Sequence, residues 1–222
     1  MTSIYFRGRE DKLAILAHVL RDYLSGSVLD VGCDRGYLRS FVKGRYVGID
    51  IAGRPECVVD LEYGLPFRDG SFDAVVAFDV LEHLNKIHYA CDELFRVARH
   101  YVVIGLPNPY ELRFRVKFLL GKPISGKYGL PIEPPSDRHR WLFTLDEARK
   151  LVTARGGRYG FSLEKYVVGY YKYRQPMLRL IMGAISRSRI LPNVFAYYGV
   201  FVLGKGGCNV AGEKGLGRTP SG

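Results

Sequence analysis

The sequence predicts an α/β fold, in which a mostly parallel sheet is covered by helices on both faces. One observation is that strand-like runs alternate with segments of helical spacing over residues 28–107. Another is the chain's size and composition: 222 residues, 47% hydrophobic and 25% charged, are enough for one domain with a sizeable core. We expect a single domain over residues 1–204, followed by a glycine-rich, disordered tail over 205–222.

The N-terminal half is predicted to alternate helices and strands. Residues 10–24 carry apolar side chains at three- and four-residue spacing, which is typical of an amphipathic helix. Helical spacing recurs at 37–44 and at 85–98, where Asn85 is a suitable N-cap. Runs rich in Val, Ile and Phe predict strands at 28–32, 45–51, 57–60, 72–81 and 101–107. Strands that alternate with helices form parallel sheets through right-handed crossovers.

The pattern changes after Pro107. Prolines, glycines, basic and aromatic residues are mixed over 107–140, which predicts an insertion rather than another strand–helix unit. Within it, LRFRVKF (112–118) alternates basic and apolar residues like a half-buried strand, although LRFRVKFLL also fits a lid helix. Further along, we expect a helix from Thr144, as N-cap with Glu147 three residues on, to about residue 155. A last antiparallel pair of strands is then expected at 158–171 and 194–204, with a helix between them at 176–191.

A glycine-bearing turn, Asp30-Val31-Gly32-Cys33-Asp34-Arg35-Gly36, follows the strand at 28–32. Glycines let the backbone turn sharply and let a ligand approach the main chain. Asp50 ends the next strand, 18 residues beyond Gly32, where its carboxylate can accept both hydroxyls of an adenosine ribose. The spacing favours a nucleoside ligand.

Two nucleoside ligands compete for this turn. A dinucleotide on the G-x-G-x-x-G pattern needs a glycine at position 34, and Asp34 would repel its pyrophosphate, so a nicotinamide oxidoreductase is disfavoured. S-adenosylmethionine has no phosphates, and carboxylates stabilise its sulfonium and ammonium groups. An acidic turn is therefore compatible with S-adenosylmethionine.

Four segments resemble, in order and spacing, the class I S-adenosylmethionine-dependent methyltransferases of the type 11 group. They are VLDVGCDRG, YVGID, DLEYGLPFRDGSFDAVVAFDVLEHL and LFRVARHYVVIGLPNP. The resemblance implies a Rossmann-like sheet of order 3-2-1-4-5-7-6 with strand 7 antiparallel, and S-adenosyl-L-methionine as cofactor. The segment from 96 to 130, with RHRWLFTLDEA after it, is more loosely similar to the methionine biosynthesis W proteins.

The resemblance also assigns cofactor-site residues by position. It implies that the turn residues surround the methionine moiety, that Asp50 holds the ribose, and that residues at or just after the ends of the strands at 45–51, 57–60 and 72–81 line the rest of the site. The full set is Asp30, Gly32, Cys33, Asp34, Gly36, Asp50, Ile51, Asp60, Leu61, Asp79, Val80 and His83. Asp34 departs from the family, which usually has glycine there.

No catalytic residue is identified from the sequence. Methyl transfer from a sulfonium is an in-line displacement that depends on bringing the acceptor close, so a general base is optional. His83 fits a lining residue and a packing residue equally well. His139 could take a proton from a hydroxyl acceptor, but an exposed loop histidine is the favoured interpretation.

The charge is unevenly distributed. Residues 1–106 carry 13 Lys and Arg against 15 Asp and Glu, whereas residues 107–222 carry 20 against 7. If the basic half binds a partner, an anionic one is favoured, such as a phosphorylated small molecule or a lipid surface. A basic face that is only solvated fits the charge equally well. Nucleic acid is disfavoured because no recognised binding motif accompanies the charge, while peripheral membrane contact stays open.

The four cysteines show no CxxC spacing, so neither a metal site nor a disulfide framework is predicted. The first residues do not read as a secretory signal, and no apolar run is long enough to span a membrane, which predicts a cytoplasmic protein.

The sequence thus predicts a methyltransferase with a cofactor half over 1–106 and an acceptor-side half over 107–204, acting on a small-molecule, lipid or glycan-precursor acceptor. Residues 107–143, and also 172–193, are candidates to cover the acceptor. The alternative is a catalytically silent protein of the same fold that docks a partner enzyme: Asp34 favours it, and the intact Asp50 and Asp60 oppose it.

Overall fold

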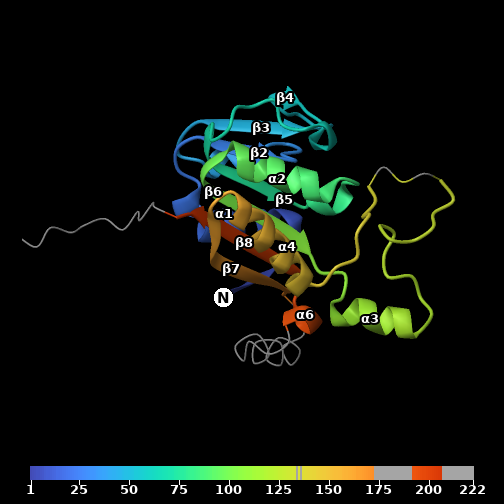
Figure 1. Ribbon diagram of the computed structural model, residues 1–222. Helices are drawn as coiled ribbons and strands as arrows, with labels where there is room; N and C mark the ends of the chain where they lie inside the picture. Colours follow the sequence, from blue (N-terminus) through green and yellow to red (C-terminus); the bar gives the residue numbers. More distant parts are fainter. Residues whose placement is uncertain (134, 136, 173–191, 207–222) are drawn as a thin grey trace, which may run out of the picture.

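The computed structural model describes residues 1–133, 135, 137–172 and 192–206. One eight-stranded sheet runs through them in the order β1-β7-β8-β6-β5-β2-β3-β4 (Figure 1). The strands are β1 Thr2–Phe6, β2 Val28–Val31, β3 Tyr46–Asp50, β4 Cys57–Val58, β5 Phe72–Phe78, β6 Ala98–Pro107, β7 Phe161–Tyr171 and β8 Tyr198–Lys205. The helices are α1 Arg9–Val19, α2 Ile87–Val97, α3 Leu112–Leu119, α4 Leu145–Arg158 and α6 Pro192–Phe195.

The strand order confirms the predicted sheet. β2, β3, β4, β5 and β6 pair in parallel, and β8 lies antiparallel between β6 and β7. When β1 is set aside and β2 to β8 are renumbered 1 to 7 in chain order, this is the order 3-2-1-4-5-7-6, with strand 7 (β8) antiparallel. The carboxyl ends of β2, β3 and β5 consequently meet at one edge of the sheet, where α/β folds bind ligands.

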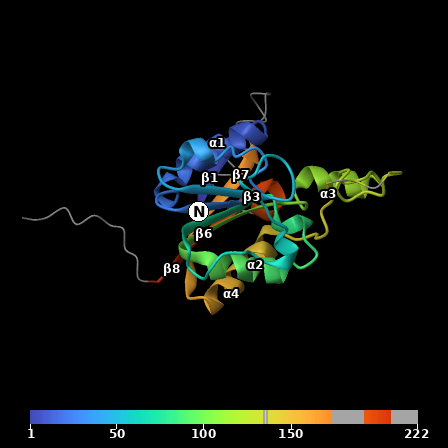
Figure 2. The same ribbon diagram turned by 90° about the horizontal axis from the view of Figure 1, so that it is seen from above.

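Helices cover both faces of the sheet. Seen from above, α1 lies on one face, and α2 and α4 lie on the other (Figure 2). Leu16, Leu20 and Val76 belong to the apolar cluster under α1, while Leu94, Val152 and Phe201 belong to the one under α2 and α4. The two clusters hold the edge that carries the strand ends in place.

The edge strand β1 is not predicted by the sequence analysis. It pairs in parallel with β7 from Thr2 to Phe6, and it buries Ile4 and Phe6. Five residues at a chain end give too short a pattern for a periodicity argument. This strand leads into α1 and brings the N-terminal segment to the ligand-binding edge.

The predicted helix at 37–44 is wrong. Only a 3₁₀ turn, Arg39–Phe41, forms there. The segment follows Gly36, which has a φ of 69°, and ends at Gly44, where a Cβ would collide with the backbone of Gly26. A segment this short nucleates a helix poorly, and the close approach at Gly44 directs the chain into β3.

Two helix starts can be compared with their predictions. At α4 the Thr144 hydroxyl accepts from the Glu147 amide at 3.2 Å while the Glu147 carboxylate accepts from the Thr144 amide, so the predicted capping box is confirmed. At α2 the N-cap position falls on Lys86 rather than on the predicted Asn85. The reason is the Glu62 carboxylate, which accepts from both the Asn85 and Lys86 amides and takes the place of a local cap.

The insertion contains a helix and not a strand. α3 extends away from the body of the molecule with no buried residue (Figure 1). No helix within the described ranges is long and apolar enough to cross a membrane. The predicted helix at 176–191 and the tail from 207 onward lie outside the described residues.

Candidate cofactor and acceptor site

A cavity of about 630 Å³ opens at the carboxyl edge of the sheet. Its wall includes the last residues of four strands, namely Val31, Asp50, Phe78 and Pro107. The candidate site residues that line it are Gly32, Asp34, Asp50, Ile51, Asp60, Leu61, Asp79, Val80 and His83. The fold therefore brings most of the residues singled out in the sequence to one cavity.

The turn after β2 has the backbone that its glycines permit. Gly32 has a φ of 74°, and a Cβ there would collide with the Val80 side chain. Gly36 also has a positive φ, but it does not line the cavity. Gly32 is required both by its backbone conformation and by its close packing against the residue that follows β5.

Asp34 adopts the left-handed conformation, with a φ of 50°. Glycine reaches this region without strain, and aspartate is among the few other residues that tolerate it, which explains how Asp34 can replace a glycine here. Its carboxylate forms an ion pair with Arg9, with Nη1 and Oδ2 3.1 Å apart.

Asp50 is held in place at the end of β3 by two backbone amides. The Asp34 amide donates to Oδ2 at 2.8 Å, and the Ala52 amide donates to Oδ1 at 3.2 Å. These bonds turn the carboxylate toward the cavity and keep it there. Next to it, the Ile51 side chain is 68% exposed on the cavity wall.

Asp60 and Leu61 form another part of the wall. Asp60 Oδ1 accepts from the Glu62 amide at 2.9 Å and caps the short 3₁₀ helix Leu61–Tyr63, in which Leu61 is buried. The cap fixes both residues beside the end of β3.

Asp79 closes the cavity after β5, and it also has a positive φ, of 57°. Its Oδ2 accepts from Lys12 Nζ at 2.5 Å. Lys12 is only 5% exposed, and its ammonium lies 3.8 Å from the centre of the Tyr198 ring. A buried lysine needs such partners to remain charged, so the Asp79 carboxylate and the ring stabilise it together.

Asp30 and Cys33 lie behind the turn and not on the main cavity. They line a small separate crevice. Asp30 is 4% exposed and accepts from the Tyr46 hydroxyl at 2.7 Å. Burial raises the pKa of Asp30 to about 7, against the opposing effect of the Tyr46 hydrogen bond.

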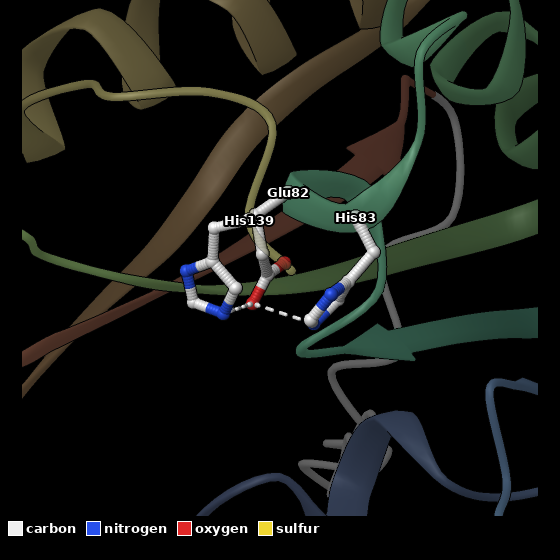
Figure 3. Close-up of side chains that lie close together, drawn as sticks. All are labelled: Glu82, His83 and His139. Atoms are coloured by element: carbon white, nitrogen blue, oxygen red, sulfur yellow. Dashed lines mark ion pairs between the residues drawn. The ribbon is translucent and has the colours of Figure 1, made fainter. Parts of the chain in front are cut away.

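At the opposite wall, Glu82, His83 and His139 converge (Figure 3). Glu82 and His83 lie on the 3₁₀ helix Leu81–His83, and His139 comes from the insertion. His139 is 8% exposed, so the favoured interpretation of an exposed loop histidine is wrong. The reason is tertiary: the Arg140 amide donates to the Glu82 carbonyl at 2.8 Å and the Trp141 indole donates to the Leu84 carbonyl at 2.6 Å, which fastens this end of the insertion over the cavity.

Burial controls the protonation of the three side chains. It lowers the pKa of His83, and together with nearby Lys127 it lowers the pKa of His139 to about 4. Burial also raises the pKa of Glu82, and Asp79 adds to this increase. Both imidazoles are therefore neutral at pH 7.

Comparisons with known proteins agree with this geometry. Residues 29–103, about a third of the chain, match the family model described as a methyltransferase domain, of type 11. Those residues are therefore similar to a methyltransferase domain, as the resemblance in the sequence predicts. The matched residues contain the cavity wall from Gly32 to His83, and the insertion that carries His139 lies beyond them.

Two curated relatives extend the match. A Mycolicibacterium smegmatis protein named "Probable S-adenosylmethionine-dependent methyltransferase" is 33% identical over 126 residues, which are 50% of this chain and 47% of that protein. A bifunctional methionine biosynthesis protein MetXA/MetW of Rhodopirellula baltica is 30% identical over 105 residues, 37% of this chain and 17% of that protein. The chain spans less than half the length of either relative, and the second bears out the looser resemblance.

A solved structure shows the fold of the methyltransferase domain over more of the chain. Magnesium protoporphyrin IX methyltransferase from Synechocystis, which holds S-adenosylhomocysteine, is 19% identical with a TM-score of 0.55. The similarity covers 88% of this chain and 83% of that one. The likeness of fold to that protein therefore extends on both sides of the matched residues.

Sequence reasoning missed several residues of this cavity, among them Lys12 and Glu82. Lys12 is one of the buried side chains of α1. A lysine next to the apolar stripe of the predicted helix was the sequence feature that could have indicated a buried, paired lysine. Glu82 is fully buried in LEHL, where nothing local distinguishes it from a surface carboxylate.

Proposed function

We propose that this chain, over residues 1–204, is an S-adenosylmethionine-dependent methyltransferase whose cofactor lies across the carboxyl ends of β2, β3 and β5. The observation that carries the proposal is the Asp50 carboxylate, held by two backbone amides at the cavity wall next to the turn that contains Gly32. An acid in this place suits a ribose with two free hydroxyls.

The other wall residues divide between the two ends of the cofactor. Ile51, Asp60 and Leu61 suit the adenine, because they offer an exposed apolar side chain and a carboxylate acceptor for its amino group. The turn residues Asp30, Gly32, Cys33, Asp34 and Gly36, with Asp79, Val80 and His83, surround the methionine end; those that lie behind the turn act by shaping it.

Two cations from the N-terminal segment complete the methionine end. Arg9 and Lys12 both line the cavity, and each is paired with an acid of the turns after β2 and β5. S-adenosylmethionine carries a carboxylate and an ammonium on the same carbon. An alternating set of acids and bases matches that pair of charges.

The chemistry proposed is an in-line displacement. The acceptor atom forms a bond to the methyl carbon as the carbon–sulfur bond breaks, and the sulfonium becomes the neutral thioether S-adenosylhomocysteine. Lys127, Asp137 and His139 of the insertion line the same cavity as Asp50, which suits them to hold the acceptor. An anionic small molecule, a lipid or a glycan precursor fits the basic acceptor-side half.

We also infer that α3 rests on an anionic membrane surface and so brings lipid-like acceptors to the cavity. Phe118, Leu119 and Leu120 are 70%, 82% and 65% exposed, and they lie beside Lys117 and Lys122. Apolar side chains flanked by lysines are the pattern of an interfacial helix. The occupant proposed is a bilayer with anionic headgroups.

Titration calorimetry with S-adenosylmethionine and S-adenosylhomocysteine tests the proposed function. We expect micromolar binding of both, and a loss of at least tenfold in affinity in Asp50→Ala, which cannot accept from the ribose hydroxyls. Asp22→Ala is the matched control. The Asp22 carboxylate is 83% exposed, and it precedes β2, whereas the cavity-lining turn follows it. If the wild-type chain binds neither ligand, the methyltransferase proposal is wrong, and a non-catalytic binding protein of the same fold is favoured.

A further inference from the structure

Hydrogen-bond acceptors of three side chains, Glu82, His83 and His139, lie close together at the wall of the cavity. Glu82 is fully buried, and both of its carboxylate oxygens lack a hydrogen-bond partner, as does His139 Nε2. Such orphaned groups are rare in the interior of a protein and call for a partner. His83 Nε2 lies 3.9 Å from Glu82 Oε1, and His139 Nε2 lies 4.0 Å from the same oxygen (Figure 3).

The other nitrogen of each imidazole is already engaged. His83 Nδ1 lies 3.1 Å from the Arg138 carbonyl and 3.2 Å from Asp137 Oδ1, and since both are acceptors, Nδ1 must carry the proton. His83 Nε2 is then a lone pair. His139 Nδ1 lies 2.9 Å from the Tyr128 hydroxyl, which can accept from it in the same tautomer. Outer partners of this kind orient histidine ligands of metal ions.

The separations fit an ion better than a shared proton. A hydrogen bond between Glu82 and either imidazole would need about 2.7–3.2 Å, which neither separation reaches. Two ligand atoms bound to one tetrahedral zinc ion at about 2.0–2.1 Å each lie about 3.3 Å apart, somewhat closer than the separations seen here. All ligand atoms of the cluster are within 4.8 Å of one another, so the side chains need to rotate toward one another to close a tetrahedral shell around one ion.

We propose that Glu82, His83 and His139 bind a divalent cation of the zinc type, and that the open coordination position faces the cavity. Two imidazoles and one carboxylate are a ligand set that zinc takes in catalytic sites, where a fourth position is left for a water or substrate oxygen. The neighbouring charges leave room for the ion, because Lys12 is paired with Asp79 and Lys127 with Asp137. This departs from the sequence-based expectation of no metal, which rested on cysteine spacing alone.

The role of the ion rests on the proposed function. A hydroxyl or carboxylate oxygen of the acceptor would occupy the open position, next to the turn after β5 that borders the cofactor. Coordination makes a hydroxyl more acidic, so its proton leaves to solvent before or as the oxygen–methyl bond forms and the methyl–sulfur bond breaks. The ion thereby selects acceptors that offer an oxygen.

The first test is calorimetric titration of the full, chelator-treated chain with ZnCl₂. We expect one zinc ion per chain, and at least a hundredfold loss of affinity in Glu82→Gln and in His139→Gln. His18→Gln, an exposed histidine of α1, is the matched control and should bind zinc as the wild type does. Equal zinc affinity in the wild type and in His139→Gln would overturn the site.

Cobalt(II) gives a spectroscopic readout of the ligands. Binding at the cluster should produce visible bands without sulfur charge-transfer absorption, and His139→Gln should abolish them. Cys57 is an exposed free thiol, so a sulfur signature would assign the ion to a cysteine and contradict the proposal.

Titrations with S-adenosylhomocysteine separate this inference from the proposed function. His139→Gln should keep S-adenosylhomocysteine affinity within about threefold while losing zinc, and Asp50→Ala should lose S-adenosylhomocysteine while keeping zinc. Retained cofactor binding without a zinc site would overturn the inference alone. Zinc binding without any cofactor binding would overturn the proposed function alone.

Discussion

Asp34 and Asp79 are two non-glycine residues with left-handed backbone at the edge of the cavity, with φ values of 50° and 57°. Each is also paired with a cation of α1, Asp34 with Arg9 and Asp79 with Lys12. A left-handed residue with a Cβ costs about 1–2 kcal/mol, and less for aspartate. Asp34 and Asp79 thus place carboxylates beside the cations of α1, and this placement is accompanied by backbone strain.

Substitution at Asp34 separates backbone strain from charge. Asp34→Gly relieves the strain and gives up an exposed ion pair of little worth, so its free energy of unfolding should stay within about 1 kcal/mol of wild type. Asp34→Val places a β-branched residue at positive φ and should lose about 2 kcal/mol more than the glycine variant. Urea denaturation measures both, and equal stabilities would contradict the backbone explanation.

Asp30 makes the stability of the fold depend on pH. Burial raises its folded-state pKa to about 7, well above that of an unfolded aspartate, so the folded state binds the extra proton. Stability therefore falls as pH rises from about 4 to about 7, by an amount on the order of a few kcal/mol. In Asp30→Asn that decline should disappear while the acceptor for the Tyr46 hydroxyl remains. Parallel pH profiles of the unfolding free energy for the two proteins would contradict this assignment.

At the scale of elements, α3 differs from the other helices longer than one turn. α1, α2 and α4 each bury several side chains against the sheet, whereas α3 buries none. Most helical stability in proteins comes from packing an apolar face, and eight residues are too few for a stable isolated helix. Contact through Phe114 with Tyr197 anchors one side of α3, and its other side needs a further surface to cover it.

Vesicle sedimentation tests the surface proposed for α3. The wild type should bind phosphatidylcholine vesicles that contain phosphatidylglycerol, bind pure phosphatidylcholine weakly, and release as salt is raised, because exposed charges are screened. Phe118→Ser combined with Leu119→Ser should reduce binding at least fivefold. Val58→Ser combined with Tyr63→Ser removes comparably exposed apolar side chains beside β4 and should leave binding unchanged. Equal losses in both double variants would argue against a specific role for α3.

At the scale of the whole molecule, the cavity joins parts that are far apart in the chain. Its lining runs from Phe6 before α1 to Tyr197 before β8. A ligand that contacts all of these segments binds only the folded state, and thus stabilises the entire sheet rather than one loop.

Linkage makes this coupling measurable. S-adenosylhomocysteine at a hundred times its dissociation constant should raise the free energy of unfolding by about 2.7 kcal/mol. Asp50→Ala at the same ligand concentration should show little or no increase. Chemical denaturation with and without ligand provides the measurement, and stabilisation of the variant by the full amount would mean that the ligand binds elsewhere.

The strands and the turns that follow them were predictable because each depends on a few consecutive residues, whereas the strand order was predicted from the resemblance to the type 11 methyltransferases. Periodicity marks β2, β3 and β5, and parallel connections then place their carboxyl ends, with Gly32, Asp50 and Asp79, at one edge. The roles of these residues toward the cofactor stay predictions. The failed helix at 37–44 and the unforeseen β1 mark the limit of local patterns.

Sequence alone thus determined the strands β2, β3 and β5, the glycine turn and the acids at the strand ends, because these are properties of single elements. Only the tertiary structure decided that Lys12 neutralises Asp79 and that His139, 57 residues after Glu82, comes to face it. Proximity of that kind depends on how the insertion docks against the body of the fold, through bonds such as that of Trp141 to Leu84. No periodicity within either segment encodes that contact, because it arises from the packing of one segment on the other.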